Sequence, residues 1–216
     1  MGIFDLNDNA YVIRQPFMGS NIYYIDDFYK TPDVIVDYLN KKPGCIHHPN
    51  LHVKHKSLNG KYFDDRRHVF ECEEILKVYD HLSTICGQPP IRCIDTTVRT
   101  NQTKFFKNDF NNFKENYWYP HWDPGYNGLV YFNKYDNTCG TNLYRNIHSK
   151  LEPMGHEHVD PWKSKRDWKI LKTITAVYNR CVLFDGKKFP HGMHIPNDTY
   201  FGEEYRLNQG FFFEEQ

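Results

Sequence analysis

The chain has 216 residues, and its 27 basic and 27 acidic residues give a formal net charge of zero. This balance provides no general electrostatic attraction to a nucleic-acid backbone or to an anionic membrane, so we expect neither as a partner. No apolar run approaches the roughly 20 residues of a membrane-spanning helix, and the N-terminus lacks the pattern of a signal peptide, so we expect a cytoplasmic protein.

The length suits a single domain over residues 1–216, with N-terminal strands and helices over residues 1–90. Residues 11–13 and 21–25 predict two short strands because they are rich in β-branched and aromatic side chains. The six cysteines are scattered and form no C-x-x-C pair, which favours reduced thiols over a disulfide framework.

Two helices are expected next. Thr31-Pro32 predicts the start of the first, with Thr31 as N-cap and Pro32 at the first helical position, and the helix should end near residues 42–44. The stretch from about 42 to 69 has no periodicity, so we expect a loop. A second helix is expected from 71 to 85, where an apolar stripe is followed by Gly87.

From residue 91 onward, short aromatic or β-branched runs are separated by turn residues. Many short strands with polar connections argue for a sandwich or jelly roll with helices packed outside, so the expected fold class is α+β and mainly β. Residues 148–166 resemble an inserted loop with a helical turn near Trp162. The expected strands lie around residues 95–99, 117–122, 129–132, 141–144, 170–178, 181–184, 191–195 and 206–213.

His121-Trp122-Asp123 is the most informative motif, together with the distant His191. Two imidazoles and one carboxylate on one face of an octahedral ion are the ligand set of non-haem Fe(II) oxygenases. In a strand, residues i and i+2 point to the same side, so His121 and Asp123 would reach one ion. An isolated H-x-D pair is more often a structural turn, and the context reverses that expectation. Residues 180–186 read as a buried strand and turn just before His191, and Arg206 opens the final strand.

This ordered set resembles the 2-oxoglutarate- and Fe(II)-dependent dioxygenases, in particular their prolyl-hydroxylase-like branch, over roughly residues 96–213. The resemblance implies a double-stranded β-helix (jelly roll) core over residues 91–216, with Fe(II) as metal, 2-oxoglutarate as co-substrate and O2 as oxidant. It implies that the catalytic metal ligands are His121, Asp123 and His191.

The resemblance also implies a binding site for the far carboxylate of 2-oxoglutarate. Arg206 would be its salt-bridge partner, a role that suits the planar guanidinium fork. Tyr131, in the Tyr-Phe-Asn run at 131–133, would donate a hydrogen bond to the same carboxylate, and Asn208 is a further candidate contact.

The implied reaction is hydroxylation of an unactivated C–H bond in a small-molecule or peptidyl substrate, such as a free or peptidyl amino acid. This inference is an analogy with the family and does not come from site chemistry. Two other classes stay open: a non-catalytic jelly-roll binding module, and a cupin-like metal enzyme that does not use 2-oxoglutarate.

Several other residues compete for these roles. The gap between His191 and Arg206 is long for such enzymes, so Arg180 and Lys187 are alternative cations for the 2-oxoglutarate carboxylate. His194 is an alternative to His191 as the third metal ligand. Residues 156–160 (His-Glu-His-Val-Asp) loosely resemble the motif of metallo-β-lactamase-like hydrolases, but Pro161 replaces the next histidine, so we favour a loop. The remaining histidine group lies in an aperiodic segment and is expected to be solvated: His47, His48, His52 and His55.

Overall fold

The computed structural model describes residues 2–41, 45–46, 63–70, 73–90, 98–148 and 161–214; for 45–46, 63–70 and 98–99 it describes the backbone only. The larger sheet is built from β1 (Val12–Phe17), β2 (Ser20–Ile25), β3 (Cys45–Ile46), β4 (Phe63–Phe70), β5 (Val98–Phe105), β7 (Tyr126–Tyr131), β11 (Cys181–Asp185) and β13 (Arg206–Phe212). The other strands are β6 (Asn116–Trp118), β8 (Thr141–Asn146), β9 (Trp162–Ser164), β10 (Trp168–Ile174) and β12 (His191–Met193). The helices are α1 (Pro32–Lys41), α2 (Glu73–Cys86) and α3 (Phe110–Glu115), with a 3-10 turn η2 (Lys107–Asp109) before α3.

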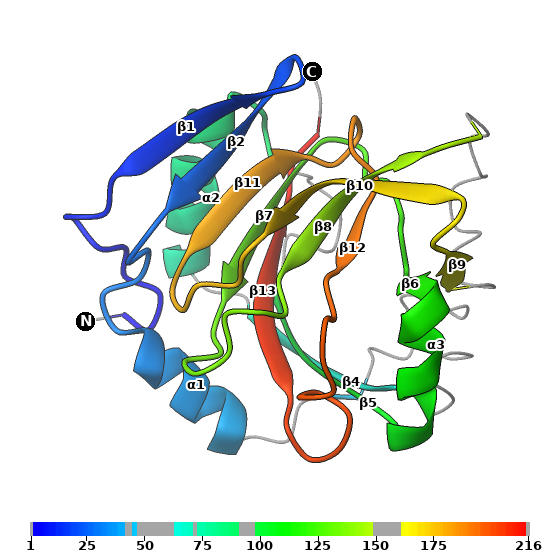
Figure 1. Cartoon of the computed structure of the whole chain (residues 1–216). Helices are drawn as coiled ribbons and strands as arrows, with labels where there is room; N and C mark the ends of the chain where they lie inside the picture. Colours follow the sequence, from blue (N-terminus) through cyan, green and yellow to red (C-terminus); the bar gives the residue numbers. More distant parts are fainter. Residues whose placement is uncertain are drawn as a thin grey trace.

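The strands form antiparallel sheets, as the sequence predicts for a mainly β protein (Figure 1). The larger sheet has the order β1-β2-β11-β7-β13-β5-β4-β3 and the smaller sheet the order β10-β8-β12, while β6 pairs with β9. Side chains from both sheets share one buried cluster, so the sheets pack face to face in a manner compatible with a β-sandwich.

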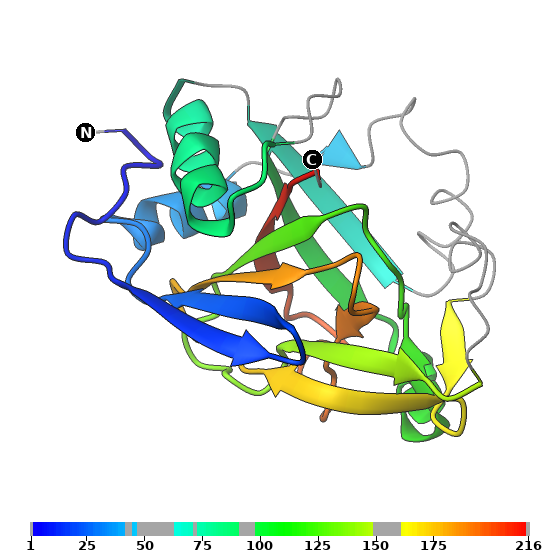
Figure 2. The same ribbon diagram turned by 90° about the horizontal axis from the view of Figure 1, so that it is seen from above.

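Helices α1 and α2 cover the outer face of the larger sheet, opposite the smaller sheet (Figure 2).

Strand β11 shows how the sequence produces these layers. Its Cys181 and Leu183 pack in the cluster that contains the helices, whereas Val182 and Phe184 pack in the cluster that contains the smaller sheet. A strand buried on both faces needs a continuous apolar run, which explains the Cys-Val-Leu-Phe sequence.

The two predicted helices are confirmed. Helix α1 begins at Pro32 and buries Ile35 and Leu39 against the sheet. Helix α2 buries four side chains at helical spacing, and Gly87 follows it with φ +72°, donating its N–H to Ser83 O at 2.8 Å. A left-handed residue at this position is the usual helix end, which glycine adopts without steric cost. None of the described helices is long and apolar enough to cross a membrane.

The structure corrects three local expectations. The stretch 42–69 is not all loop, because β3 and β4 lie in it and β4 pairs with β5 along its whole length. Its Asp-Asp-Arg-Arg centre has no apolar alternation, so the pairing was not visible in the sequence. The helical turn expected near Trp162 is wrong as well, since strand β9 pairs there with β6. Helix α3 was not predicted because six residues are too few for a helical period.

Candidate metal centre

The two histidines of the predicted ligand set lie side by side. His191 begins β12 and pairs with Leu143 of β8. His121 follows β6 and forms an isolated antiparallel bridge to His191, with backbone N···O distances of 3.0 and 2.8 Å, and their ring centroids are 4.3 Å apart. The expectation that His121 and Asp123 share a regular strand is wrong, because only His121 bridges and Asp123 lies in the following loop.

A turn after β11 holds the loop that carries Asp123. The Asp123 N–H donates to Gly186 O at 3.2 Å, and the Gly186 N–H donates to Gly125 O at 2.8 Å. A Cβ atom at position 186 would lie 3.0 Å from Gly125 O and 3.1 Å from the Asn127 amide. A side chain at position 186 would therefore be tightly packed between the two backbone segments, whose hydrogen bonds hold the loop that carries the carboxylate.

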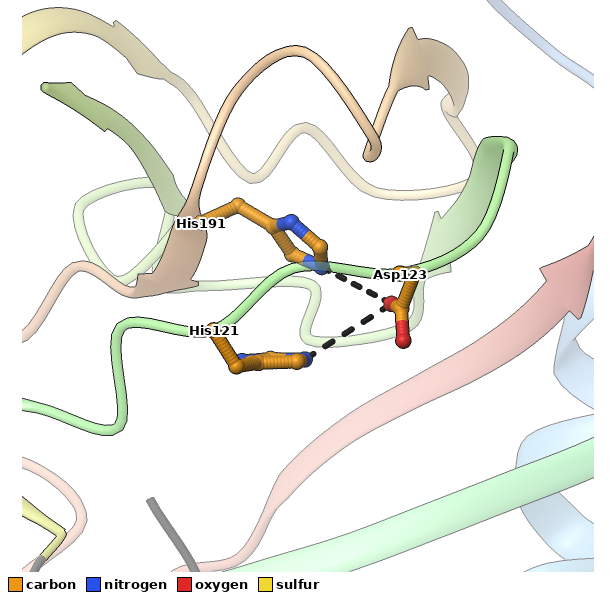
Figure 3. A group of neighbouring side chains, drawn as sticks. All are labelled: His121, Asp123 and His191. Carbon is orange, nitrogen blue, oxygen red and sulfur yellow. Dashed lines mark ion pairs between the residues drawn. The ribbon is translucent and has the colours of Figure 1, made fainter. Parts of the chain in front are cut away.

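The three side chains converge on a small volume (Figure 3). Asp123 Oδ2 lies 3.1 Å from His191 Nε2 and 3.7 Å from His121 Nε2, and the three ligand atoms all lie within 4.8 Å of one another. Two ligands at right angles, each about 2.1 Å from an ion, would be about 3 Å apart. The distance between Asp123 and His191 matches this spacing, and the other ligand atoms would have to approach by at most about 2 Å to hold one divalent cation. His191 is 6% exposed but His121 and Asp123 are 24% and 20% exposed, so one side of the cluster remains accessible.

Backbone carbonyls orient both imidazoles. Nδ1 of His121 lies 2.8 Å from Tyr119 O, and Nδ1 of His191 lies 3.2 Å from Phe189 O. Because a carbonyl oxygen only accepts hydrogen bonds, each Nδ1 carries the proton in the neutral ring, and each Nε2 presents its lone pair to the cluster. Tyr119 adopts φ +57°, which is unusual for a residue with a side chain and turns the chain sharply before His121.

The carboxyl of Asp123 stays ionised. Burial acts to raise its pKa, but a hydrogen bond from His191, the positive charge that the imidazoles of His121 and His191 carry when protonated, and the amide of Asn127 outweigh burial and hold the pKa well below its usual value. When both imidazoles are neutral, as metal binding requires, the cluster combines one negative charge with two nitrogen lone pairs.

Sequence reasoning missed Asn127, which is only 3% exposed. Its Nδ2 donates a hydrogen bond to Asp123 Oδ2 and lies 2.8 Å from His191 Nε2. Asn127 lies four residues before Tyr131 on β7, so the period-2 rule places both on the same face, toward the smaller sheet. A polar residue at the start of an otherwise apolar strand was the available signal.

Arg206 is buried at 2% exposure on β13. Its Nε donates to Cys139 O at 3.2 Å and its Nη2 to Gly140 O at 3.1 Å, and its guanidinium carbon lies 5.8 Å from the centre of the Tyr131 ring. Among the side chains that the structure describes, no carboxylate pairs with it. Buried charges are normally paired, so this guanidinium lies in a place suited to an anionic ligand.

Two hydroxyl groups, those of Tyr131 and Thr141, pair with each other near Arg206. The Tyr131 hydroxyl is 2.8 Å from Thr141 Oγ1, and burial raises the pKa of Tyr131, so the phenol stays protonated and can donate a hydrogen bond. Thr141 was not predicted as a site residue. Thr141 lies on β8, two residues before Leu143, which corresponds to about 7 Å along the strand. Leu143 is the residue of β8 that pairs with His191.

The structure separates the remaining candidates. Asn208 lies opposite Tyr131, and its Oδ1 accepts a hydrogen bond from Asn101 Nδ2 at 3.0 Å. Arg180 forms a two-bond ion pair with Asp26, so it does not replace Arg206. Lys187 is exposed.

His194 does not join the cluster. Its Nδ1 lies 3.1 Å from Asn142 Nδ2, and Asn142 alternates with Thr141 and Leu143, so this contact lies on the opposite face of β8. The histidines at 47–55 and the motif at 156–160 lie outside the described residues. Among the described cysteines, Cys86, Cys139 and Cys181 are free thiols.

No protein-family model matches the sequence, and no curated protein matches it significantly. The function must therefore be argued from the chemistry of the residues that converge in the fold: two imidazoles, one carboxylate and, on the same inner face, one buried guanidinium.

Proposed function

We propose that the protein is an Fe(II)- and 2-oxoglutarate-dependent dioxygenase that hydroxylates an unactivated C–H bond. The observation that carries this proposal is the convergence of His121, Asp123 and His191, whose ligand atoms lie within 4.8 Å of one another. Three protein ligands occupy one face of an octahedral ion and leave positions for a co-substrate and for oxygen.

The strand order supports a double-stranded β-helix core. The larger sheet contains the run β11-β7-β13-β5 and the smaller sheet the run β10-β8-β12, to which the bridge at His121 adds a fourth segment. From β5 to β13, the chain repeatedly crosses between the two sheets, as it does in jelly rolls. His191 pairs with Leu143, whose side chain packs in the cluster shared by the two sheets, so the His191 side chain lies on this inner face.

Fe(II), when bound, would supply the centre at which O2 reacts while 2-oxoglutarate is decarboxylated to succinate and carbon dioxide. The residues of the chain hold and orient the reactants. The carbonyls of Tyr119 and Phe189 keep both imidazoles in the tautomer that binds a metal, and the turn at Gly186 holds the carboxylate loop in place.

Arg206 and the two hydroxyl groups would bind the far carboxylate of 2-oxoglutarate. A guanidinium makes two parallel charge-assisted hydrogen bonds to a carboxylate, and the protonated Tyr131 phenol can add a third. The separation of about 7 Å along β8 between Thr141 and the residue opposite His191 is one that a five-carbon dicarboxylate can bridge. The preference for an amino acid or a peptidyl residue as substrate rests on the family resemblance alone.

Ligand-dependent thermal stability tests this proposal. Protein loaded with Mn²⁺, a redox-stable substitute for Fe(II), should gain thermal stability from 2-oxoglutarate beyond that given by Mn²⁺ alone. With Fe(II) and O2, it should then form succinate. A cupin-like enzyme that does not use 2-oxoglutarate would respond to the metal only. A non-catalytic binding module would form no succinate, and either result would contradict the proposal.

A further inference from the structure

A cavity of about 280 Å³ lies beside the smaller sheet, and none of the described residues that line it belongs to the metal centre. Helix α3, strands β6, β8, β10 and β12, the turn before β10 and the residues after β12 form its walls (Figure 1). Asn142 of β8 is one of the lining residues, and its side chain points away from the face on which Leu143 packs between the two sheets. The cavity is therefore a second site, distinct from the metal centre.

The charged side chains that line this cavity are positive. They are Lys114 of α3 and Lys165, which follows β9, and no aspartate or glutamate is found among the described lining residues. The charge of Lys165 reaches into the cavity, because it acts together with burial to lower the pKa of the lining residue His194. This potential favours an anionic ligand over a cationic one.

The ammonium group of Lys165 is held in place. It donates to Phe113 O at 2.6 Å and to Lys114 O at 3.1 Å, and it lies 5.4 Å from the centre of the Tyr117 ring. A lysine ammonium has three N–H donors, so one donor has no partner among the described residues. Because the side chain is already ordered, binding of an anion here would cost little further conformational entropy.

The apolar wall of the cavity consists of aromatic rings that are packed against other rings. The Tyr117 and Tyr144 ring centres are 4.8 Å apart. Trp118 and Phe113 are 3% and 6% exposed, and the Trp162 ring centre lies 4.7 Å from the first and 4.8 Å from the second. A largely apolar, preformed wall with a few polar groups is typical of small-molecule sites, and the volume is just below that of sites for drug-sized ligands, roughly 300–1,000 Å³. The cavity therefore suits a compact molecule with one ring.

His194 adds a hydrogen-bonding group to this wall. Its Nδ1 lies 3.1 Å from Asn142 Nδ2, and Asn142 is itself held by hydrogen bonds to Tyr144 and Thr173. The Nε2 atom of His194 has no hydrogen-bond partner among the described residues. An imidazole nitrogen can donate or accept, so Nε2 can pair with a ligand in either tautomer.

We propose that this cavity binds a small aromatic anion, which consists of one ring that carries a carboxylate or a phosphate group. The ring packs against Tyr117 and Trp118, and the anionic group accepts a charge-assisted hydrogen bond from Lys165. The site uses neither the metal nor 2-oxoglutarate, so its test is independent of the proposed function.

NMR titration of the full-length, ¹⁵N-labelled chain with benzoate, phenyl phosphate and benzylamine tests this proposal. At least one of the two anions should shift the backbone amide signals of Tyr117, Lys165 and His194 in a saturable way, with a dissociation constant on the order of 1 mM or tighter. Benzylamine has the same ring and a positive charge, so it should bind at least about tenfold more weakly. Tighter binding of benzoate would identify a carboxylate as the natural group, and tighter binding of phenyl phosphate would identify a phosphate.

Lys165→Met keeps the length of the side chain and removes its charge, so it should weaken binding of the preferred anion about tenfold. Lys114→Met provides a second comparison if that variant does not fold, with an expected loss of about threefold because this ammonium is exposed. Lys172→Met is the matched control. The Lys172 ammonium also lies near an aromatic ring, 5.8 Å from the centre of Phe17, but it is outside the cavity, so the affinity should not change.

Three results would overturn the proposal. The first is that neither anion gives saturable shifts at concentrations up to about 20 mM. The second is that benzylamine binds as tightly as the anions, or that Lys165→Met binds them as tightly as wild type. The third is that the shifts are confined to Arg206 and Tyr131, because the anions would then bind at the inner guanidinium and not in this cavity.

Discussion

Replacement of Arg206 by leucine should abolish the response to 2-oxoglutarate while the metal centre is retained. The guanidinium is 2% exposed and donates to two backbone carbonyls, at Cys139 and Gly140. A carboxylate placed against it would accept two charge-assisted hydrogen bonds, each worth about 1.5–3 kcal/mol. The loss of both hydrogen bonds amounts to about 3–6 kcal/mol, which raises the dissociation constant of 2-oxoglutarate roughly 10²- to 10⁴-fold.

These magnitudes translate into a thermal shift assay. At 2-oxoglutarate concentrations about 100 times its dissociation constant, wild-type protein loaded with Mn²⁺ should gain about 2.7 kcal/mol of stability. For a chain of this size the corresponding rise in Tm is about 5–10 °C. In Arg206→Leu the same concentration would give at most about 0.4 kcal/mol, and so a rise of about 1 °C.

Arg180→Leu is the control, because this guanidinium is paired with Asp26 and should not contact the co-substrate. It should lower Tm without changing the shift that 2-oxoglutarate produces. Arg206→Lys should give an intermediate shift, since a lysine keeps the charge but loses the planar fork. A full shift in Arg206→Leu would refute the assignment of the anion site to this residue.

Three further predictions concern the site. In Tyr131→Phe, loss of one donor should raise the dissociation constant of 2-oxoglutarate about fivefold by calorimetry, and an unchanged constant would place the carboxylate elsewhere. Gly186→Ala should destabilise the protein by about 1–3 kcal/mol in urea unfolding, because the new Cβ would lie 3.0 Å from Gly125 O; no loss would mean that the turn adjusts freely. The folded pKa of Asp123 is lowered, so its contribution is complete above its unfolded pKa of about 3.9 and is lost as the pH falls through the folded value. The difference in unfolding free energy between metal-free wild type and Asp123→Asn should therefore shrink as the pH falls below about 4, and a difference that grows there would contradict this.

The parts of the fold that were predictable are those with a strong local pattern. Helices α1 and α2 carry end signals and apolar stripes, and β11 is a continuous apolar run. Strand β4 was missed because its sequence has no apolar alternation and its pairing partner β5 lies far along the chain. Helix α3 was missed because its two phenylalanines are too few to establish a period.

The site divides in a similar way. His121, Asp123 and His191 were identified as a group because their residue types have one shared chemistry, even though the regular strand assumed for the first two is absent. Asn127 and Thr141 have no such signal, since a lone amide or hydroxyl on a strand is common. Their importance depends on neighbours that are distant in the sequence: Asn127 contacts His191, and Thr141 contacts Tyr131.

The most direct test of the central claim is anaerobic absorption spectroscopy of the protein with Fe(II) and 2-oxoglutarate. If both bind at one centre made by His121, Asp123 and His191, a weak visible charge-transfer band should appear only when metal and co-substrate are present together. His121→Ala and Asp123→Ala should each abolish it. A band that persists unchanged in both variants, or no band in wild-type protein, would contradict the assignment of this centre.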